Sequence, residues 1–304
     1  MPRGKEKLDR VGEIHKLNDG NTVTIIEYFE CTNCTIEYDD GVIRKNVRYD
    51  ALKKGITEKP VNRTGERIIN CEGCEMEIIK WEGYKKVTVR FNDIYGAVLE
   101  KRTYQHFQGG SISNPYHRTV YNLGYLGQGK YSPQNDPISY TKWRTMIQRC
   151  YDPTWRIENA TYKDATICEE WHNFQNFTNW FYKAYNYKTM TKKWCLDKDI
   201  LIKGNKIYSP ETCCFVPNHI NVLFNTNSKV RGHYPLGVQK IKDKFISCRV
   251  GEHKAEKFDT ELEAFQAYKT AKETEIKRVA DIYKDQINPK VYDAMYNWII
   301  EITD

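Results

Sequence analysis

The sequence contains no long apolar run. None approaches the roughly 20 consecutive apolar residues that a membrane-spanning helix needs, and the N-terminal stretch MPRGKEKLDR lacks the apolar core of a secretion signal. These two absences argue against a membrane protein and against a secreted one. We therefore expect a cytoplasmic protein that has no membrane partner.

Neither sign of charge is in large excess. The 304 residues include 47 basic and 40 acidic side chains, which gives a net charge of +7. This balance is compatible with a nucleic-acid partner without establishing one, because many proteins carry as much positive charge. The aromatic content of 13% argues against disorder, and the chain length predicts two or three folded domains.

Cysteine, in contrast, is frequent. With ten cysteines and no secretion signal, we expect reduced thiols or a metal site instead of disulfides. Two CxxC pairs, Cys31 with Cys34 and Cys71 with Cys74, have the spacing of a four-thiolate zinc site. The internal repeat described next argues against zinc, because the pairs occupy different positions in its two copies and Cys31 aligns with Tyr84. The one four-thiolate zinc site still compatible with the repeat would bridge both copies.

Residues 11–60 and 63–116 read as two copies of one module. Gly12 aligns with Gly65, and both copies contain short runs in which apolar and polar residues alternate. Such runs predict small twisted β sheets or barrels, with Asp40-Gly41 as a hairpin turn. Modules of this kind suit DNA contact or target docking, and equally well protein binding or packing.

The next segments lead toward the centre of the chain. Residues 117–139 contain three glycines and two prolines among scattered tyrosines, which predicts a linker or an extended arm. Residues 140–151 carry an apolar stripe at helical spacing, and residues 165–185 carry a dense aromatic one. Stripes of this kind are typical of helices that build a core.

Residues 194–227 predict a strand, a turn, a second strand and a helix. The first strand would be Cys195–Ile202, and Gly204-Asn205 would reverse the chain. A second strand is expected near residues 212–216. Pro217 would then begin a helix, because proline has no amide hydrogen to leave unpaired in a first turn.

The segment Leu-Asp-Lys-Asp at 196–199, followed by Tyr-Ser-Pro at 208–210, resembles the HNH nuclease motif of a phage endonuclease branch. The Trp-Arg-x-Met-x-x-Arg-Cys-Tyr helix and the Cys-Glu-Glu-Trp turn extend the resemblance over residues 138–228. It implies that Asp197 and Asn221 bind a divalent metal ion, Mg²⁺ or Mn²⁺. The general-base histidine of the family corresponds to Lys198, and the asparagine that orients this histidine corresponds to Thr212.

The departure at Lys198 leaves three interpretations open. An ordinary lysine, with a pKa near ~10.4, is charged at neutral pH and cannot accept a proton. Lys198 would then contact phosphate while Asp199 or a metal-bound water performs the proton chemistry. Alternatively, His219 reaches in from the helix, or the site has lost cleavage and kept only binding.

Residues 235–304 predict three short strands and a long helix. Thr260 and Glu263 have the spacing of a capping box for that helix. This order is similar to the DNA-binding domain of plant ethylene-response factors, whose sheet enters the major groove. The resemblance implies DNA contacts from the sheet residues Gln239, Lys240, Lys242, Lys244 and Arg249.

Together these patterns predict an α+β multidomain protein. Its parts would be the modules 11–60 and 63–116, the linker 117–139, a ββα-metal nuclease domain 140–228 and a DNA-binding domain 235–304. The expected function is site-specific, metal-dependent hydrolysis of double-stranded DNA by a monomer in the host cytoplasm, without a small-molecule cofactor. The alternatives are a catalytically silent DNA-binding regulator or anti-host factor on the same scaffold, and a zinc-organised interaction module at the N-terminus.

Overall fold

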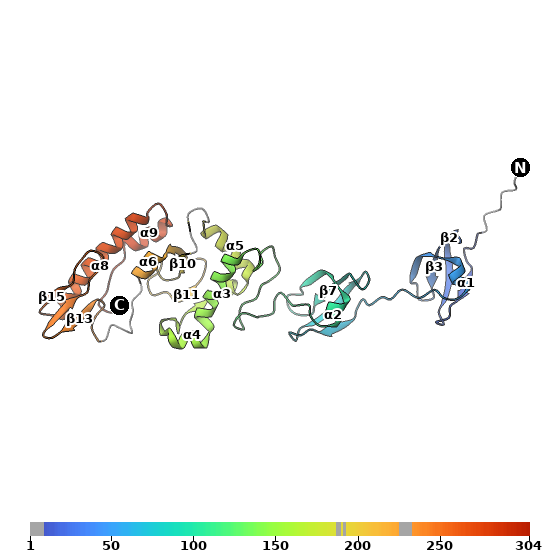
Figure 1. The fold of residues 1–304 in the computed structure, drawn as a ribbon, viewed down its shortest axis with the longest axis horizontal. Coiled ribbons are helices and arrows are strands. Elements are labelled where there is room, and N and C mark those ends of the chain that lie inside the picture. Colours follow the sequence, from blue (N-terminus) through green and yellow to red (C-terminus); the bar gives the residue numbers. More distant parts are fainter. Residues whose placement is uncertain (1–8, 187–189, 191–192, 225–232) are drawn as a thin grey trace. The chain divides into compact units, whose positions relative to one another are not determined.

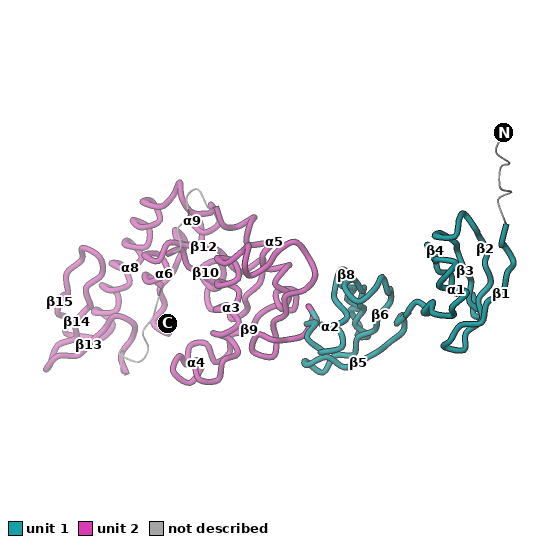
Figure 2. The backbone as a smooth tube through the Cα atoms, turned by 45° about the vertical axis from the view of Figure 1, so that its right-hand side comes forward, with its two compact units in different colours: residues 1–114 teal, residues 115–304 magenta. Residues whose placement is uncertain are grey.

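The computed structural model describes residues 9–186, 190, 193–224 and 233–304. It divides the chain into two compact units, residues 1–114 and 115–304 (Figure 2). The architecture mixes several small, mostly antiparallel sheets with helices, which confirms the predicted α+β multidomain class. None of the helices in the described ranges combines the length and apolar character that a membrane crossing demands.

Unit 1 contains two four-stranded antiparallel sheets of the same strand order (Figure 1). Each sheet is a simple meander followed by one short helix. The elements of the first module are β1 (Ile14–Lys16), β2 (Thr22–Glu30), β3 (Asn33–Tyr38), β4 (Ile43–Val47) and α1 (Tyr49–Lys53). Those of the second are β5 (Arg67–Ile69), β6 (Glu75–Trp81), β7 (Val87–Phe91), β8 (Val98–Arg102) and α2 (Tyr104–Gln108).

The sequence repeat reappears in the backbone of the two modules. The amide of Gly12 donates to the carbonyl of Ile25 at 2.8 Å, and that of Gly65 donates to Ile78 at 2.8 Å. Both glycines have φ near the left-handed region, at 89° and 90°, which side chains rarely adopt. The alternation of the strands places Val23 and Ile25 inside, together with the residues that match them in the second copy.

An Arg–Glu–Tyr cluster occurs at the same place in each module. In the first, Glu13 accepts hydrogen bonds from Arg10 at 2.8 Å and from the hydroxyl of Tyr49 at 2.9 Å. In the second, Glu66 accepts from Arg63 at 3.1 Å and from Tyr104 at 3.0 Å. Each cluster therefore ties the entry of its sheet to its helix and compensates the charge of its arginine.

Unit 2 begins with a helical region around an aromatic core. Its elements are α3 (Pro137–Tyr151), α4 (Pro153–Glu158), the 3₁₀ helix Ala160–Tyr162, β9 (Thr166–Ile167), the 3₁₀ helix Glu169–His172 and α5 (Phe174–Ala184). Fully buried Trp143, Trp171 and Phe177 fill the space between them. The helix expected over residues 165–185 starts later than predicted, because the side chain of Asn173 accepts the amide of Gln175 at 2.9 Å and caps α5.

Residues 117–139, expected as a linker, pack against this helical region. Tyr125 donates its amide to His172 and accepts the amide of Phe174, each at 3.0 Å. The side-chain amide of Gln175 donates to the carbonyls of Leu126 and Tyr131. The glycines that suggested an extended arm instead permit close approach, since a Cβ on Gly124 would lie within 3 Å of side-chain atoms of α3.

The expected hairpin and helix follow. They comprise β10 (Trp194–Asp197), β11 (Ile207–Tyr208), β12 (Cys214–Pro217) and α6 (Asn218–Leu223). Strand β10 pairs antiparallel with β12, and β11 pairs in parallel with β9. The first strand is shorter than predicted because the carboxylate of Asp197 accepts two backbone amides and turns the chain. Residues 225–227 of the predicted segment lie outside the described residues.

The last part of unit 2 is a three-stranded antiparallel sheet with helices. Its elements are β13 (Val238–Ile241), β14 (Lys244–Ser247), β15 (Glu256–Phe258), α8 (Glu261–Tyr283) and α9 (Pro289–Tyr296). The capping box of Thr260 and Glu263 is present at the start of α8, as predicted. At Gly237, φ is 76° and a Cβ would meet the ring of Tyr268 at 2.1 Å, so glycine lets α8 lie close to the sheet.

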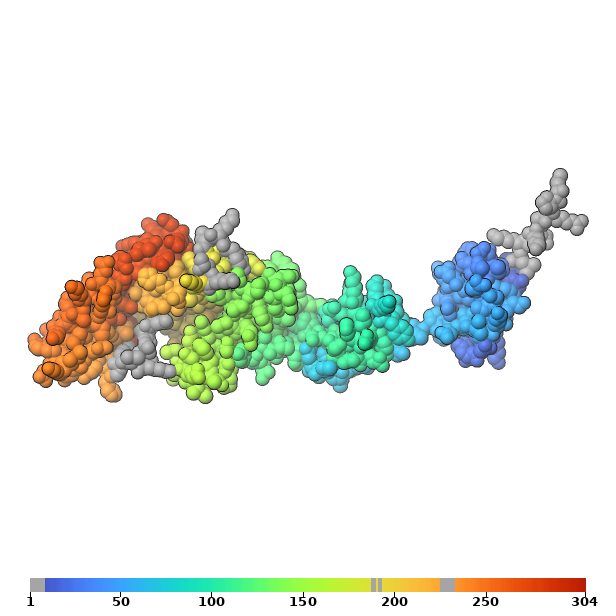
Figure 3. Space-filling view, in the orientation of Figure 1, coloured from blue at the N-terminus to red at the C-terminus, as the bar shows by residue number. Residues whose placement is uncertain are grey.

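One hydrophobic core joins the regions that were expected as separate domains at 140–228 and 235–304. It includes Trp143 of α3, Ile220 of α6, Val238 of β13, and Ile276 and Val291 of the last two helices. In the space-filling view, the hairpin region and the C-terminal helices form a continuous surface (Figure 3). The hairpin is therefore held by the helices on both sides of it in the sequence.

Candidate functional site

Asp197 lies at the end of β10, where the hairpin turns. Its side chain is 9% exposed, and one carboxylate oxygen accepts the amides of Asp199 at 2.9 Å and Ile200 at 2.8 Å. These amides hold the carboxylate in a fixed orientation. The structure thus gives a geometric reason for an aspartate at this strand end.

Asp199 brings a second carboxyl group to the same place. Burial, followed by the charge of Asp199, raises the pKa of Asp197 to about 6, although the two backbone amides oppose the change. Two carboxylates in such proximity repel each other, and a divalent cation would relieve this repulsion. Within the described ranges, no further His, Cys, Asp or Glu joins these two carboxylates at ligand distance.

Lys198 lies between these two aspartates in the sequence, and its side chain is buried in the protein. It is 7% exposed, and its ammonium group lies 2.9 Å from a carboxylate oxygen of Asp199. The ammonium also lies 5.9 Å from the ring centroids of Tyr162 and Tyr208. The ammonium of Lys198 is therefore held beside Asp199, and the phosphate contact of the first interpretation stays a prediction.

Arg149 of α3 approaches the same two tyrosines. Its guanidinium carbon lies 5.9 Å from the ring centroid of Tyr162. Burial would lower the pKa of Arg149, but electrostatic interactions with Tyr162 and Tyr208 outweigh burial and raise this pKa. Sequence reasoning did not include Arg149 among the site residues, because the packing of α3 on the hairpin is not visible in the spacing of its residues.

The other predicted residues of the hairpin lie in surroundings that differ from those of Asp197, Lys198 and Asp199. Asn221 is half-buried on α6, the helix that packs on β10 and β12. The ring of His219 is exposed and lies edge-on to Tyr283 of α8, with centroids 6.0 Å apart. Thr212 donates its hydroxyl to the carbonyl of Ile207 at 2.7 Å and supports the loop before β12. The metal-binding and catalytic roles of Asn221 and His219 remain predictions.

The four cysteines of the considered zinc site differ in exposure. Cys34 is a core residue of the first module, its thiol donates to the carbonyl of Val47 at 3.0 Å, and burial raises its pKa. Cys31 and Cys71 are exposed, and Cys74 is half-buried. A four-thiolate site would require Cys34 to leave that core and to ionise, because zinc binds the thiolate.

The pleat of the C-terminal sheet divides the residues expected to contact DNA. Strand pairing places Gln239 and Lys244 on the face away from α8, together with Lys257, which sequence reasoning missed. Lys240 lies on the opposite face, with its ammonium 5.2 Å from the ring of Phe245. Lys242 occupies the turn with φ of 58°, and Arg249 follows β14 and donates to the carbonyl of Gly251. We call Gln239, Lys244 and Lys257 the outer face.

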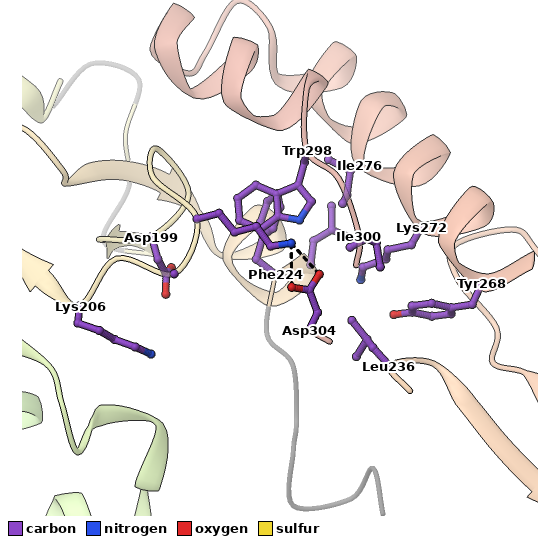
Figure 4. A pocket seen from close by; sticks show the side chains of 13 residues that line it. Asp199, Lys206, Phe224, Leu236, Tyr268, Lys272, Ile276, Trp298, Ile300 and Asp304 are labelled. Carbon is purple, nitrogen blue, oxygen red and sulfur yellow. Dashed lines mark hydrogen bonds and ion pairs between the residues drawn. The ribbon is translucent and has the colours of Figure 1, made fainter. Parts of the chain in front are cut away.

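A pocket of about 210 Å³ lies beside Asp199 (Figure 4). Aromatic side chains and three lysines line it: Phe224, Tyr268 and Trp298, with Lys203, Lys206 and Lys272. Lys203 is neutralised by Asp304 at 2.8 Å. Burial lowers the pKa of Lys272, with Glu275 opposing the change. The pocket is thus lined by Asp199 together with these lysines.

Comparisons with models of known protein families, with curated proteins and with solved structures found no match for this chain.

Proposed function

We propose that this chain is a metal-dependent endonuclease that cuts double-stranded DNA. The observation that carries the proposal is the position of Asp197 and Asp199 at the turn of a β–β–α hairpin, where the carboxylate of Asp197 accepts the amide of Asp199 at 2.9 Å. The lysines near this pair supply the opposite charge, which a DNA backbone needs.

The carboxylates fit a hard divalent ion such as Mg²⁺ or Mn²⁺, which prefers oxygen ligands. Asp197 and Asp199 would hold it, with the amide oxygen of Asn221 as the third predicted ligand. When bound, such an ion polarises the phosphodiester and lowers the pKa of its water.

The residues of the chain would divide the remaining tasks. The ammonium of Lys198 lies beside Asp199 and would attract a phosphate oxygen. The side chain of Asp199 is 41% exposed, so this carboxylate can accept a proton from an attacking water. His219, whose ring lies against Tyr283, would have to turn away from α8 to take that role.

The outer face of the C-terminal sheet would hold the duplex. A three-stranded sheet fits the major groove, where lysine and glutamine side chains reach base edges and phosphates. Gln239, Lys244 and Lys257 are all exposed on one face, as such contact requires. The assignment of DNA contact to the outer face follows from the resemblance to ethylene-response factors.

The proposal is tested by a nicking assay on phage or host DNA with Mg²⁺ or Mn²⁺. The wild type should cut, whereas Asp197→Ala and Asn221→Ala should bind DNA without cutting it. Binding without cleavage by the wild type, under either metal, would contradict the proposal.

That outcome would favour a second function, a catalytically silent DNA-binding regulator. The observation in its favour is the ion pair of Lys198 and Asp199 at 2.9 Å, which occupies the carboxylate that the nuclease mechanism needs as a base or ligand. The regulator would keep the lysine-lined surface and lose the proton chemistry.

A further inference from the structure

Two cations from distant parts of the sequence converge at the hairpin. Arg149 belongs to α3, and Lys198 follows β10. The guanidinium of Arg149 and the ammonium of Lys198 each lie 5.9 Å from the ring centroid of Tyr162. We call these two side chains the cation pair.

Only one of the two charges of the cation pair has a carboxylate partner among the described residues. Asp199 contacts Lys198, whereas among the described residues no carboxylate lies within ion-pair distance of Arg149. Tyr208, which is 2% exposed and lies near Arg149, supplies only a neutral hydroxyl. A half-buried guanidinium without a carboxylate partner, near a buried ammonium that has one, is costly unless a further anion binds.

We propose that Arg149 and Lys198 together bind a phosphate group of DNA beside Asp199. The proposal deepens the endonuclease function and rests on it for the identity of the ligand. A guanidinium presents a planar fork that matches two phosphate oxygens, and an ammonium adds a point charge to a third. The cation pair would therefore position the phosphodiester against the two carboxylates.

Two tyrosines beside the guanidinium of Arg149 restrict its position. Tyr162 lies in the 3₁₀ helix after α4, and Tyr208 lies in β11, so both rings are held by backbone elements. Lys142 lies two helical turns before Arg149 on α3. Its ammonium donates to the carbonyl of Trp194 at 2.5 Å and adds positive potential near the cation pair. A phosphate here would meet preorganised donors and would displace little structure.

Inorganic phosphate is the first probe, in buffer that contains no divalent metal. Added phosphate should raise the melting temperature of the wild type, because a ligand that binds only the folded state stabilises it. Arg149→Gln and Lys198→Gln should bind phosphate roughly tenfold more weakly or worse. The matched control is Arg144→Gln, which removes an exposed arginine from another side of the same helix and should leave the phosphate effect unchanged.

DNA is the second probe. For Arg149→Gln, single-turnover cleavage should fall by roughly 100-fold, and the slope of log affinity against log salt should decrease by about one. Arg149→Lys keeps the charge but not the fork, so it should keep the salt slope and recover only part of the cleavage rate. A purely structural arginine would change neither the salt slope nor the phosphate affinity.

The outcomes separate the two proposals. Should the wild type fail to cut DNA while phosphate still stabilises it through Arg149, the cation pair stands and the endonuclease function falls. Phosphate stabilisation that is equal in the wild type, Arg149→Gln and Lys198→Gln would overturn the cation pair, whatever the cleavage result. If Arg149→Gln does not fold, Lys198→Gln and Arg149→Lys decide between these results.

Discussion

The N-terminal modules and the hairpin treat their cations differently. In the modules, arginines are compensated in place: Arg10 and Arg63 each have a glutamate three residues away, and Arg90 contacts Glu77 at 3.1 Å. At the hairpin, Arg149 and Lys198 both approach the ring of Tyr162, and only Lys198 has a carboxylate partner, Asp199, among the described residues. A compensated charge contributes to the fold alone, whereas an uncompensated one retains attraction for a ligand.

The largest expected effect comes from Asp199→Asn, which removes the only carboxylate bonded to Lys198 among the described residues. Cleavage should fall on the order of 10²- to 10³-fold, since a ligand and candidate base are lost. Phosphate affinity should rise, because the competing anion has gone. Single-turnover kinetics and phosphate titration measure both. Weaker phosphate binding by Asp199→Asn than by the wild type would contradict the contrast between compensated and uncompensated cations.

A compensated charge in unit 2 provides the next test. Glu275 is 6% exposed and accepts two hydrogen bonds from Arg278, at 2.7 and 2.8 Å. Because Arg278 is largely exposed and screened, Glu275→Gln should cost about 1 kcal/mol of unfolding free energy at pH 7. Chemical denaturation checks this value.

The pH dependence of that loss has a definite sign. The hydrogen bonds and charge of Arg278, with His219 and His253 also near, lower the pKa of Glu275. Its contribution is therefore fully present above the unfolded pKa, near ~4.3, and disappears as the pH falls through the lower folded value. The wild type and Glu275→Gln should converge in stability in acid, and a constant difference would contradict the assignment.

Stability measurements sharpen the comparison further. Glu66→Gln should lower the melting temperature of the protein, since Glu66 accepts from both Arg63 and Tyr104. Arg149→Gln, in contrast, should leave stability nearly unchanged in phosphate-free buffer, because the guanidinium has no carboxylate partner among the described residues. Equal destabilisation by both variants would place Arg149 among the structural arginines.

The smallest expected effect concerns the C-terminal sheet. Lys257→Gln should decrease the salt slope of DNA binding by about one, because this lysine lies on the outer face. Lys240→Gln is the matched control, since Lys240 faces the opposite side and lies over Phe245. A larger change for Lys240 would show that the other face, or the sheet edge, contacts DNA.

Local patterns in the sequence predicted much of the fold. The repeat of unit 1, the capping box of α8 and the order strand, strand, helix at the hairpin each depend on residues close in sequence. The linker was misjudged because Gly124 permits close packing on α3, a tertiary effect that composition alone does not show.

The candidate site was only partly predictable for the same reason. The spacing Asp197-Lys198-Asp199 indicated a cluster, but the approach of Arg149 depends on how α3 packs on the hairpin. Likewise, the division between Lys240 and Lys257 follows from the strand register, which the sequence left undefined.

Titration of Mn²⁺ into the metal-free protein tests the central claim most directly. The account predicts one ion bound per chain by the wild type, and none by Asp197→Ala at the same concentrations, with both proteins folded. Equal binding by both proteins, or no binding by the wild type, would contradict a metal site at Asp197 and Asp199.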